Sequence, residues 1–168
     1  SYDINEPNQL VKHHLTKGTI NWWYDEDEKV SLTFGRQLNK RKEFDVRRNA
    51  ERPIIDLDLI TTDIMLEWDH SFSERSDGLI GFHYFNQDND NNPGTQTTPY
   101  IPNYNTNRFS FFIIENLKFR KNLFEFGARV DYEDYNLRGR DISQNIFRDE
   151  HSLNTVSYTH LRAHETQF

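Results

Sequence analysis

The clearest hydrophobic pattern of the chain lies between residues 104 and 137. Over residues 124–133 two sets of side chains alternate at every position, one of Phe124, Phe126, Ala128, Val130 and Tyr132 and the other of Glu125, Gly127, Arg129, Asp131 and Glu133. Side chains on a β-strand alternate between its two faces, so this stretch is predicted to be a strand with one apolar and one charged face. Residues 107–119 form a second such segment, separated from the first by Arg120 and Lys121 alone. The pattern predicts a β-hairpin with a tight turn and with arms longer than those usual in globular proteins.

Similar alternation predicts four more strands earlier in the chain, over residues 18–24, 30–39, 57–70 and 80–84. Short connections at 25–28, 73–77 and 120–121 take turns with long ones near 40–56, at 86–103 and after 137. We therefore expect an all-β protein, an antiparallel up-and-down meander of about six long strands. The expected organisation is a polar lead-in or loop at 1–14, the six strands at 15–137, a loop at 138–155 and a tail at 156–168.

One position breaks the alternation of the fifth predicted strand. If Phe111 and Ile113 lie on the apolar face, strict alternation places Glu115 on that face as well. A β-bulge near Glu115 would move the carboxylate away and let Ile114 and Leu117 share the apolar face. We expect such a bulge.

Long arms, tight turns at one end and a charged second face are typical of a β-barrel that crosses a membrane, apolar toward lipid and polar toward the lumen. Aromatic side chains also gather beside the tight turns, as in an interfacial girdle: Trp22, Tyr24, Trp68, Phe119 and Phe124. The low mean hydropathy of −0.92 is compatible with such a barrel, because only every second residue of a strand must be apolar. The chain is therefore expected to be a partial transmembrane β-barrel.

The composition argues against several kinds of partner and binding site. The formal net charge of −7 argues against nucleic acid as a partner. The chain has no cysteine, which excludes disulfides and thiolate metal sites. His13 and His14 are adjacent, so on a strand their rings would face opposite ways. We expect neither a metal nor a cofactor.

Several segments together resemble the middle of the barrel of TonB-dependent outer-membrane receptors, especially those of Bacteroidetes-type bacteria. The segments are RPIIDLDLITTDIMLEWDH, NNPGTQTTPYIPNYN, FSFFIIENLKF and LFEFGARVDYEDYNLRGRD. The resemblance covers residues 57–141 well and 16–57 more loosely. It implies a 22-stranded barrel with an internal plug and an N-terminal coupling box, of which this chain would hold about a quarter of the strands and neither the plug nor the box.

The resemblance also implies a location and partners. The chain would be a fragment of a receptor in the outer membrane of a Gram-negative bacterium, importing a scarce ligand such as a ferric siderophore. Its partners would be outer-membrane lipid and lipopolysaccharide, a small ligand such as an iron complex, and the TonB energy-coupling protein through the missing plug. An enzymatic activity is not expected, since inward-facing carboxylates are ordinary in a barrel wall.

Residues 156–166, VSYTHLRAHET, resemble a peptide that arises when sequencing-adaptor DNA is translated. We therefore expect the native sequence to stop near Thr155, and we assign no function to the residues that follow.

Candidate ligand-binding residues lie in the predicted outer loops and on the predicted lumen face. The loop residues are Arg47, Arg48, Arg52, Asp88, Asp90, Asn92, Tyr100 and Tyr104, and the lumen residues are His83, Arg129 and Asp131. The arginines belong to a basic segment, residues 40–52, that suits lipopolysaccharide phosphates or an anionic ligand. Residues 88–94 carry oxygen ligands at alternate positions but depart from a calcium-binding loop, since Pro93 and Pro99 occupy the places of its glycine and bidentate glutamate.

A second interpretation stays open at this point. A soluble antiparallel β-module for carbohydrate binding or adhesion would show the same period of two, with its apolar faces packed together and its charged faces in water.

Overall fold

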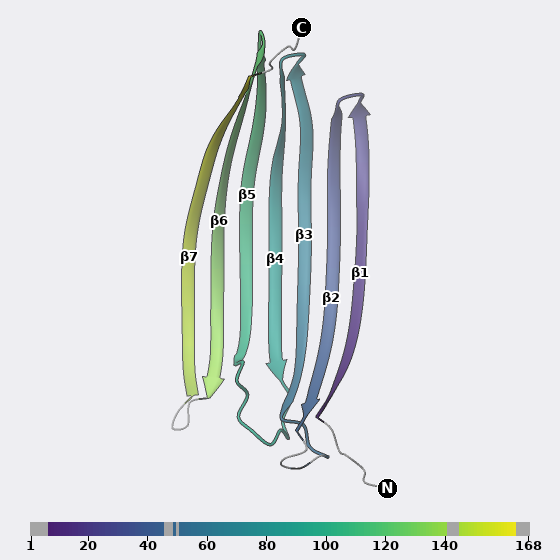
Figure 1. Ribbon diagram of the computed structural model, residues 1–168, viewed down its shortest axis with the longest axis vertical. Helices are drawn as coiled ribbons and strands as arrows, with labels where there is room; N and C mark the ends of the chain where they lie inside the picture. Colours follow the sequence, from purple (N-terminus) through teal and green to yellow (C-terminus); the bar gives the residue numbers. More distant parts are fainter. Residues whose placement is uncertain (1–6, 46–48, 50, 141–144, 164–168) are drawn as a thin grey trace.

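The computed structural model describes residues 7–45, 49, 51–140 and 145–163. They form one antiparallel sheet of seven strands in which every strand pairs with its neighbours in sequence (Figure 1). The strands are β1 (Asn8–Asp25), β2 (Glu28–Phe44), β3 (Ile55–Ser73), β4 (Ser76–Asn91), β5 (Asn103–Phe119), β6 (Asn122–Arg140) and β7 (Asn145–Ala163). The sheet is open, because β1 and β7 do not pair with each other. The predicted antiparallel meander of long strands is confirmed.

The two ends of the sheet differ in the length of the connections between strands. Two residues join β1 to β2, β3 to β4 and β5 to β6, and these turns lie together at what we call the tight-turn end (Figure 1). Arg120, in the β5–β6 turn, has a positive φ of 55°, a conformation that such short turns require. The longer connections, residues 45–54 and 92–102, lie at the opposite end, called the loop end. No helix that is long and apolar enough to cross a membrane occurs among the described residues.

The strands extend further than their side-chain patterns indicated. β1 begins at Asn8, inside the predicted lead-in, and β2 and β4 run on to Phe44 and Asn91 through segments expected to be loops. These polar strand ends are held by backbone pairing with a neighbour, for example Lys40 with Asp58 and Asn89 with Tyr104. Backbone hydrogen bonds form whatever the polarity of the side chains. The pairing between neighbouring strands therefore continues where the alternation of apolar residues has already stopped.

The expected number of six strands is wrong, because β7 covers residues for which no strand was predicted. It pairs with β6 from Asn145 opposite Arg140 to Ala163 opposite Asn122. The open edge of β6 offers unpaired N–H and C=O groups along its whole length, and a neighbouring segment can satisfy them without an apolar pattern of its own. That residues 156–166 are foreign to the native chain stays a prediction.

The predicted bulge at Glu115 is also wrong. The register of β5 against β4 and β6 runs without a shift past Glu115, which pairs with Gly78 and Phe126. The carboxylate therefore stays on the apolar face, where its Oε1 lies 2.9 Å from Nε2 of the buried His70 on β3. Gly78 lies between the two on β4, and a Cβ there would come within 2.7 Å of Glu115 Oε2. The Glu115 carboxylate thus stays on the apolar face because His70 pairs with it and because Gly78, which has no side chain, leaves room for it.

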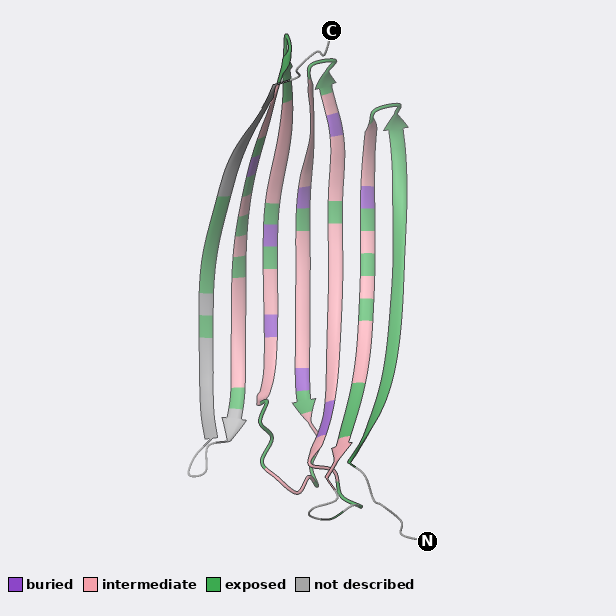
Figure 2. Cartoon of the chain, in the orientation of Figure 1, coloured by how far each residue is buried: buried purple, intermediate pink, exposed green. Residues whose placement is uncertain are grey.

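The sheet is a single layer without a packed core. Among the described residues Leu57, 7% exposed, is the one buried hydrophobic side chain. Exposure instead alternates along the strands, and Figure 2 shows β1 exposed throughout and banded exposure on β2 and β6. On β2 Leu32 and Phe34 are exposed while the intervening Thr33 and Gly35 are partly covered. The polar face is therefore the more covered side of the sheet in its middle strands.

The face that holds Leu32 and Phe34, here called the apolar face, carries three consecutive cross-strand rows of almost wholly apolar residues. From β1 to β6 the rows are Trp22, Val30, Trp68, Ile80, Ile113 and Ala128; Ile20, Leu32, Leu66, Phe82, Phe111 and Val130; and Gly18, Phe34, Ile64, Tyr84, Phe109 and Tyr132. The opposite face, here called the polar face, carries the charged residues that alternate with these. The predicted division of each strand into two faces is therefore continuous across the sheet.

On the polar face one glycine is a packing requirement. The ring of Phe112 lies over Gly81, and a Cβ on Gly81 would come within 2.0 Å of the ring's Cζ. We predict that Gly81→Val lowers the free energy of unfolding by about 1–3 kcal/mol, the usual cost of overpacking. Urea unfolding of the chain refolded into lipid vesicles, followed by tryptophan fluorescence, measures this change.

Gly35→Val is the matched control, since the nearest atom to a Cβ there is Asp63 Cβ at an ordinary 3.7 Å. It should cost little, because valine favours strands. Adding Phe112→Ala to Gly81→Val should recover part of the loss, and an equal loss in both glycine variants would contradict the explanation.

Candidate functional site

The polar face carries a hydrogen-bonded cluster on β5 and β6. Arg129 donates from Nε to the two carboxylate oxygens of Asp131 at 2.9 and 3.0 Å, and from Nη2 to Ser110 Oγ at 2.9 Å. Its guanidinium also lies over the ring of Phe112, 5.7 Å from the centroid. The strand register produces this arrangement, because Ser110 lies directly opposite Asp131 and Phe112 opposite Arg129. Arg129 and Asp131, two residues apart on one strand, thereby form a charge-compensated pair that also holds Ser110.

The next rows extend the cluster toward the loop end. Arg108 lies over the ring of Phe85 at 4.9 Å, and Thr106 donates a 3.1 Å hydrogen bond to Glu133. The Nε of Arg108 is buried and has no hydrogen-bond partner among the described residues. The polar face therefore presents alternating cationic and anionic groups that an ionic or polar ligand can contact.

A serine, a histidine and an aspartate come close on this face without forming a nucleophilic unit. His83 lies directly opposite Ser110, yet its Nε2 is 2.7 Å from Oδ2 of Asp63. Ser110 is 1% exposed and its hydroxyl is engaged by Arg129. This arrangement suits fixed polar contacts, because the hydroxyl is neither presented to a substrate nor bonded to the imidazole.

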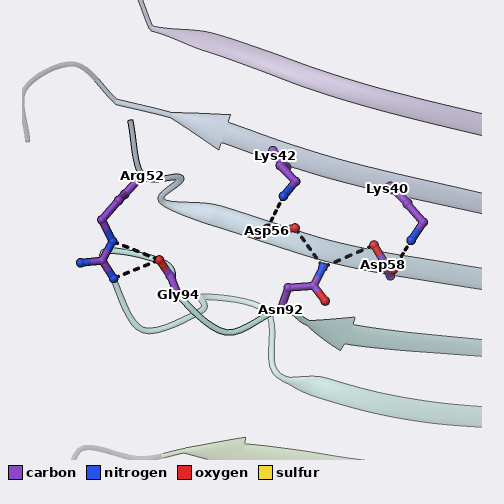
Figure 3. A network of polar contacts seen from close by, with 7 residues as sticks. All are labelled: Lys40, Lys42, Arg52, Asp56, Asp58, Asn92 and Gly94. Carbon is purple, nitrogen blue, oxygen red and sulfur yellow. Dashed lines mark hydrogen bonds and ion pairs between the residues drawn. The ribbon is translucent and has the colours of Figure 1, made fainter. Parts of the chain in front are cut away.

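A second polar network lies at the loop end, on the apolar face (Figure 3). Lys42 Nζ is 2.8 Å from Asp56 Oδ2, and Lys40 Nζ is 2.7 Å from Asp58 Oδ2, each lysine lying directly opposite its aspartate. Asn92 Nδ2 bridges the two carboxylates, at 2.9 Å from Asp56 Oδ1 and 3.4 Å from Asp58 Oδ1. The network joins β2 and β3 to the end of β4.

The two long loops are joined to each other beside this network. Gln96 N donates to Pro53 O at 3.0 Å, Thr97 Oγ1 to Ile54 O at 3.0 Å, and Arg52 donates twice to Gly94 O at 3.3 and 3.1 Å. They enclose a small, mostly apolar hollow of about 80 Å³, and Tyr100, 82% exposed, stands at its edge. The two loops thus hold each other in place at the loop end, where the ring of Tyr100 is exposed.

The candidate residues from the sequence separate into three places. His83, Arg129, Asp131 and Tyr104 lie on the polar face, where Tyr104 stacks on Tyr135 at 5.6 Å. Arg52, Asn92 and Tyr100 lie at the loop end. Asp88 and Asp90 were expected in a loop but lie within β4, on the apolar face. Arg47 and Arg48 lie outside the described residues. Because these places are separate, the candidates do not make one binding site.

Sequence reasoning missed three pairings on the apolar face, those of Lys40 with Asp58, Lys42 with Asp56 and His70 with Glu115. Lys40 and Lys42, and likewise Asp56 and Asp58, are spaced by two, so each pair shares one face of its strand. That spacing was a usable signal, but the register that sets lysine opposite aspartate depends on the length of the loop between them. The pairing of His70 with Glu115 had no sequence signal, since 45 residues separate them.

Comparisons with known proteins identified no relative: neither a family model, nor a curated protein, nor a solved structure matched the chain. The resemblance to outer-membrane receptors therefore stays a prediction.

The lysine–aspartate network can be tested by comparing its two carboxylates. Asp56 has a side chain 10% exposed and accepts from Lys42 and Asn92, whereas the side chain of Asp58 is 26% exposed. We predict that Asp56→Ala costs about 1–3 kcal/mol of unfolding free energy, because it leaves the Asn92 amide without its closest acceptor in a covered site. Asp58→Ala should cost at most about 1 kcal/mol, as at an exposed pair.

Urea-unfolding midpoints of the two variants provide the comparison. Asn92→Ala should lower the midpoint by less than Asp56→Ala, since it removes one contact of the carboxylate and keeps Lys42. A larger loss for Asp58→Ala than for Asp56→Ala would contradict this ranking.

Proposed function

We propose that the chain forms part of the wall of a transmembrane β-barrel in a bacterial outer membrane, in a TonB-dependent receptor that imports a scarce ligand such as a ferric siderophore. The proposal rests on one observation: in the middle of the sheet the apolar side chains are the more exposed ones, and the charged side chains are the more covered ones. The three apolar rows lie on the more exposed side of the sheet, while Arg129, Asp131 and Ser110 lie on the more covered side. In water this placement is unfavourable, and in a lipid bilayer it is the expected one.

The height of the apolar surface also fits a membrane. On β6 the apolar face runs from Phe124 to Tyr132, which is about 27 Å at the rise of an antiparallel strand. With the tilt usual in such barrels this corresponds to about 20 Å, close to the apolar band of outer-membrane barrels. Beyond Tyr132 the same face turns polar with Asp134 and Asn136, on the side of the loop end.

Two polar residues that lie on the apolar face are paired with each other, which is compatible with contact to lipid. His70 and Glu115 bond to each other near the tight-turn end, and the His70 ring makes tilted contacts with Trp68 at 5.0 Å and Phe72 at 4.4 Å. A carboxylate that is paired and close to the interface costs much less than a free one at mid-bilayer. The neighbouring Trp68 and Tyr24 are joined by a hydrogen bond, as aromatic residues of an interfacial girdle can be.

The open edges support a sheet that continues into further strands. β1 and β7 run in the same direction, so joining them would make a parallel pair in an otherwise antiparallel barrel. β1 is exposed along its 18 residues and presents one row of unpaired backbone groups. In the proposed receptor other strands of the barrel would pair with this row, since a lipid-facing edge has no water to satisfy it.

In this proposal the two polar regions take different roles. The polar face would line the lumen, where His83, Arg129 and Asp131 are available to the ligand or to the plug through which TonB acts. The loop end would face the outside, with Arg52, Asn92 and Tyr100 in reach of an arriving iron complex. Outer-membrane lipid and lipopolysaccharide would surround the apolar face.

A matched pair of tryptophans tests which face meets lipid. Trp22 and Trp23 are neighbours on β1, 68% and 61% exposed, and they lie on the apolar and the polar face respectively. We predict that acyl-brominated phosphatidylcholine quenches the fluorescence of a variant that retains only Trp22, made by Trp23→Phe and Trp68→Phe. A variant that retains only Trp23 should be quenched far less, because its ring points away from the lipid.

Both variants would be refolded into vesicles and measured against unbrominated lipid. Equal quenching of the two tryptophans would contradict the assignment of faces. A chain that stays folded and monodisperse in plain buffer and ignores vesicles would support the soluble carbohydrate-binding or adhesive module instead.

A second test places a charge on each face of β6. We predict that Val130→Arg impairs insertion into vesicles, because an arginine toward the bilayer midplane of a barrel costs about 2–4 kcal/mol. Arg129→Val on the polar face should insert nearly as well as the unchanged chain. Heat-modifiable mobility on gels measures insertion, and equal insertion of Val130→Arg and the unchanged chain would refute the assignment.

A further inference from the structure

An unusual group of cations lies on the apolar face, just beyond the three apolar rows toward the loop end. We call it the cationic patch; it consists of Lys12, Arg36, Lys40 and Lys42. All four residues are exposed. Arg36 is the next residue on this face after Phe34 of the last apolar row, and Leu38 lies between Arg36 and Lys40. The patch is therefore continuous with the apolar surface.

The positive charge of the patch is only partly compensated. Lys12 lies directly opposite Lys40, and like charges at such a cross-strand position destabilise a sheet. Lys40 and Lys42 have aspartate partners on β3, but Lys12 and Arg36 contact no carboxylate among the described residues. From Asn8 to Thr16 on β1 and from Arg36 to Phe44 on β2, this face carries no carboxylate. An anion bound between Lys12 and Lys40 would remove the repulsion, and Arg36 lies four residues away from Lys40 on the same face of β2.

We propose that the cationic patch binds the phosphate headgroup of an anionic membrane lipid whose acyl chains lie on the adjoining apolar rows. This inference rests on the proposed membrane location. Arginine and lysine are the side chains that bind phosphate most strongly, arginine with two parallel hydrogen bonds. A lipid is the occupant that matches the surface, because it alone joins a phosphate to chains long enough to cover Phe34, Leu32 and Ile20.

The net charge of the chain makes the inference testable. At a formal net charge of −7 the chain as a whole is repelled by an anionic membrane, so non-specific attraction is not expected. A preference for anionic vesicles would then report a local cationic site. Each lysine or arginine near an anionic surface strengthens binding about fivefold, so removing two should weaken it about 30-fold.

The experiment measures binding of the full chain to vesicles of phosphatidylcholine alone and of phosphatidylcholine mixed with phosphatidic acid. The test variant is Lys12→Gln with Arg36→Gln, which removes the two cations without orphaning a carboxylate. The control is Lys17→Gln with Arg41→Gln, which removes the same charge from the same two strands on the polar face and in addition breaks the ion pair of Arg41 with Glu43. We expect the unchanged chain and the control to prefer vesicles with phosphatidic acid, and the test variant to lose that preference.

The remaining outcomes separate the two proposals. Failure of the chain to bind either kind of vesicle would overturn the membrane location and this inference with it. Binding to neutral vesicles with no gain from phosphatidic acid would overturn the lipid site alone, as would an equal loss in both variants. Release from mixed vesicles by inorganic phosphate, at concentrations where equal ionic strength of chloride has no effect, would assign the patch to free phosphate and overturn the lipid assignment.

Discussion

The backbone hydrogen-bond ladder between neighbouring antiparallel strands is the interaction on which this structure depends. The described strands form a single layer in which Leu57 alone is a buried hydrophobic side chain, so burial of a core cannot be what organises it. The ladders instead run nearly the full length of each strand pair, from the tight turns to the loops. In water such a layer lacks the largest stabilising contribution of ordinary domains. A medium in which unpaired backbone groups are costly would strengthen it.

This architecture explains why the charged side chains are compensated in pairs, many of them between neighbouring strands. With no interior, a charged side chain is compensated by a neighbour on the same face, which lies directly opposite, two residues along or one strand further away. Lys42 and Asp56 lie opposite each other, Arg129 and Asp131 lie two apart, and His70 meets Glu115 across the glycine of the strand between them. Each compensation follows from register, and a shift of one residue would exchange the two faces.

The same reasoning links the proposed location and the proposed lipid site. A sheet with apolar rows on its exposed side needs a partner along that side, and a bilayer provides one without shape complementarity. At the boundary where the rows end, the surface carries cations on β1 and β2 and aspartates on β3 and β4. The uneven distribution of charge along one boundary distinguishes a site for an anion from a generally polar rim.

Much of the architecture was determined by the sequence alone, because strand faces and tight turns are local properties. The alternation at Phe124–Tyr132 and the two-residue turn at Arg120 and Lys121 are enough to predict a hairpin, its faces and its antiparallel direction. The grouping of His83, Arg129 and Asp131 on one face follows from the same period of two. Where alternation is weak, at Asn8–Thr16 or in β7, local pattern predicts nothing, since those strands are held by the edge of a neighbour.

Only the tertiary structure decided the register, and with it every contact between strands. Glu115 looked like an error of alternation that a bulge would repair, yet it has a partner on β3, 45 residues away. Asp88 and Asp90 looked like loop residues because their neighbours are turn formers, but both pair with β3, and Asp88 also pairs with β5, so they belong to β4. The physical reason is that backbone ladders and cross-strand ion pairs join residues distant in sequence, and no local pattern specifies which residue will lie opposite.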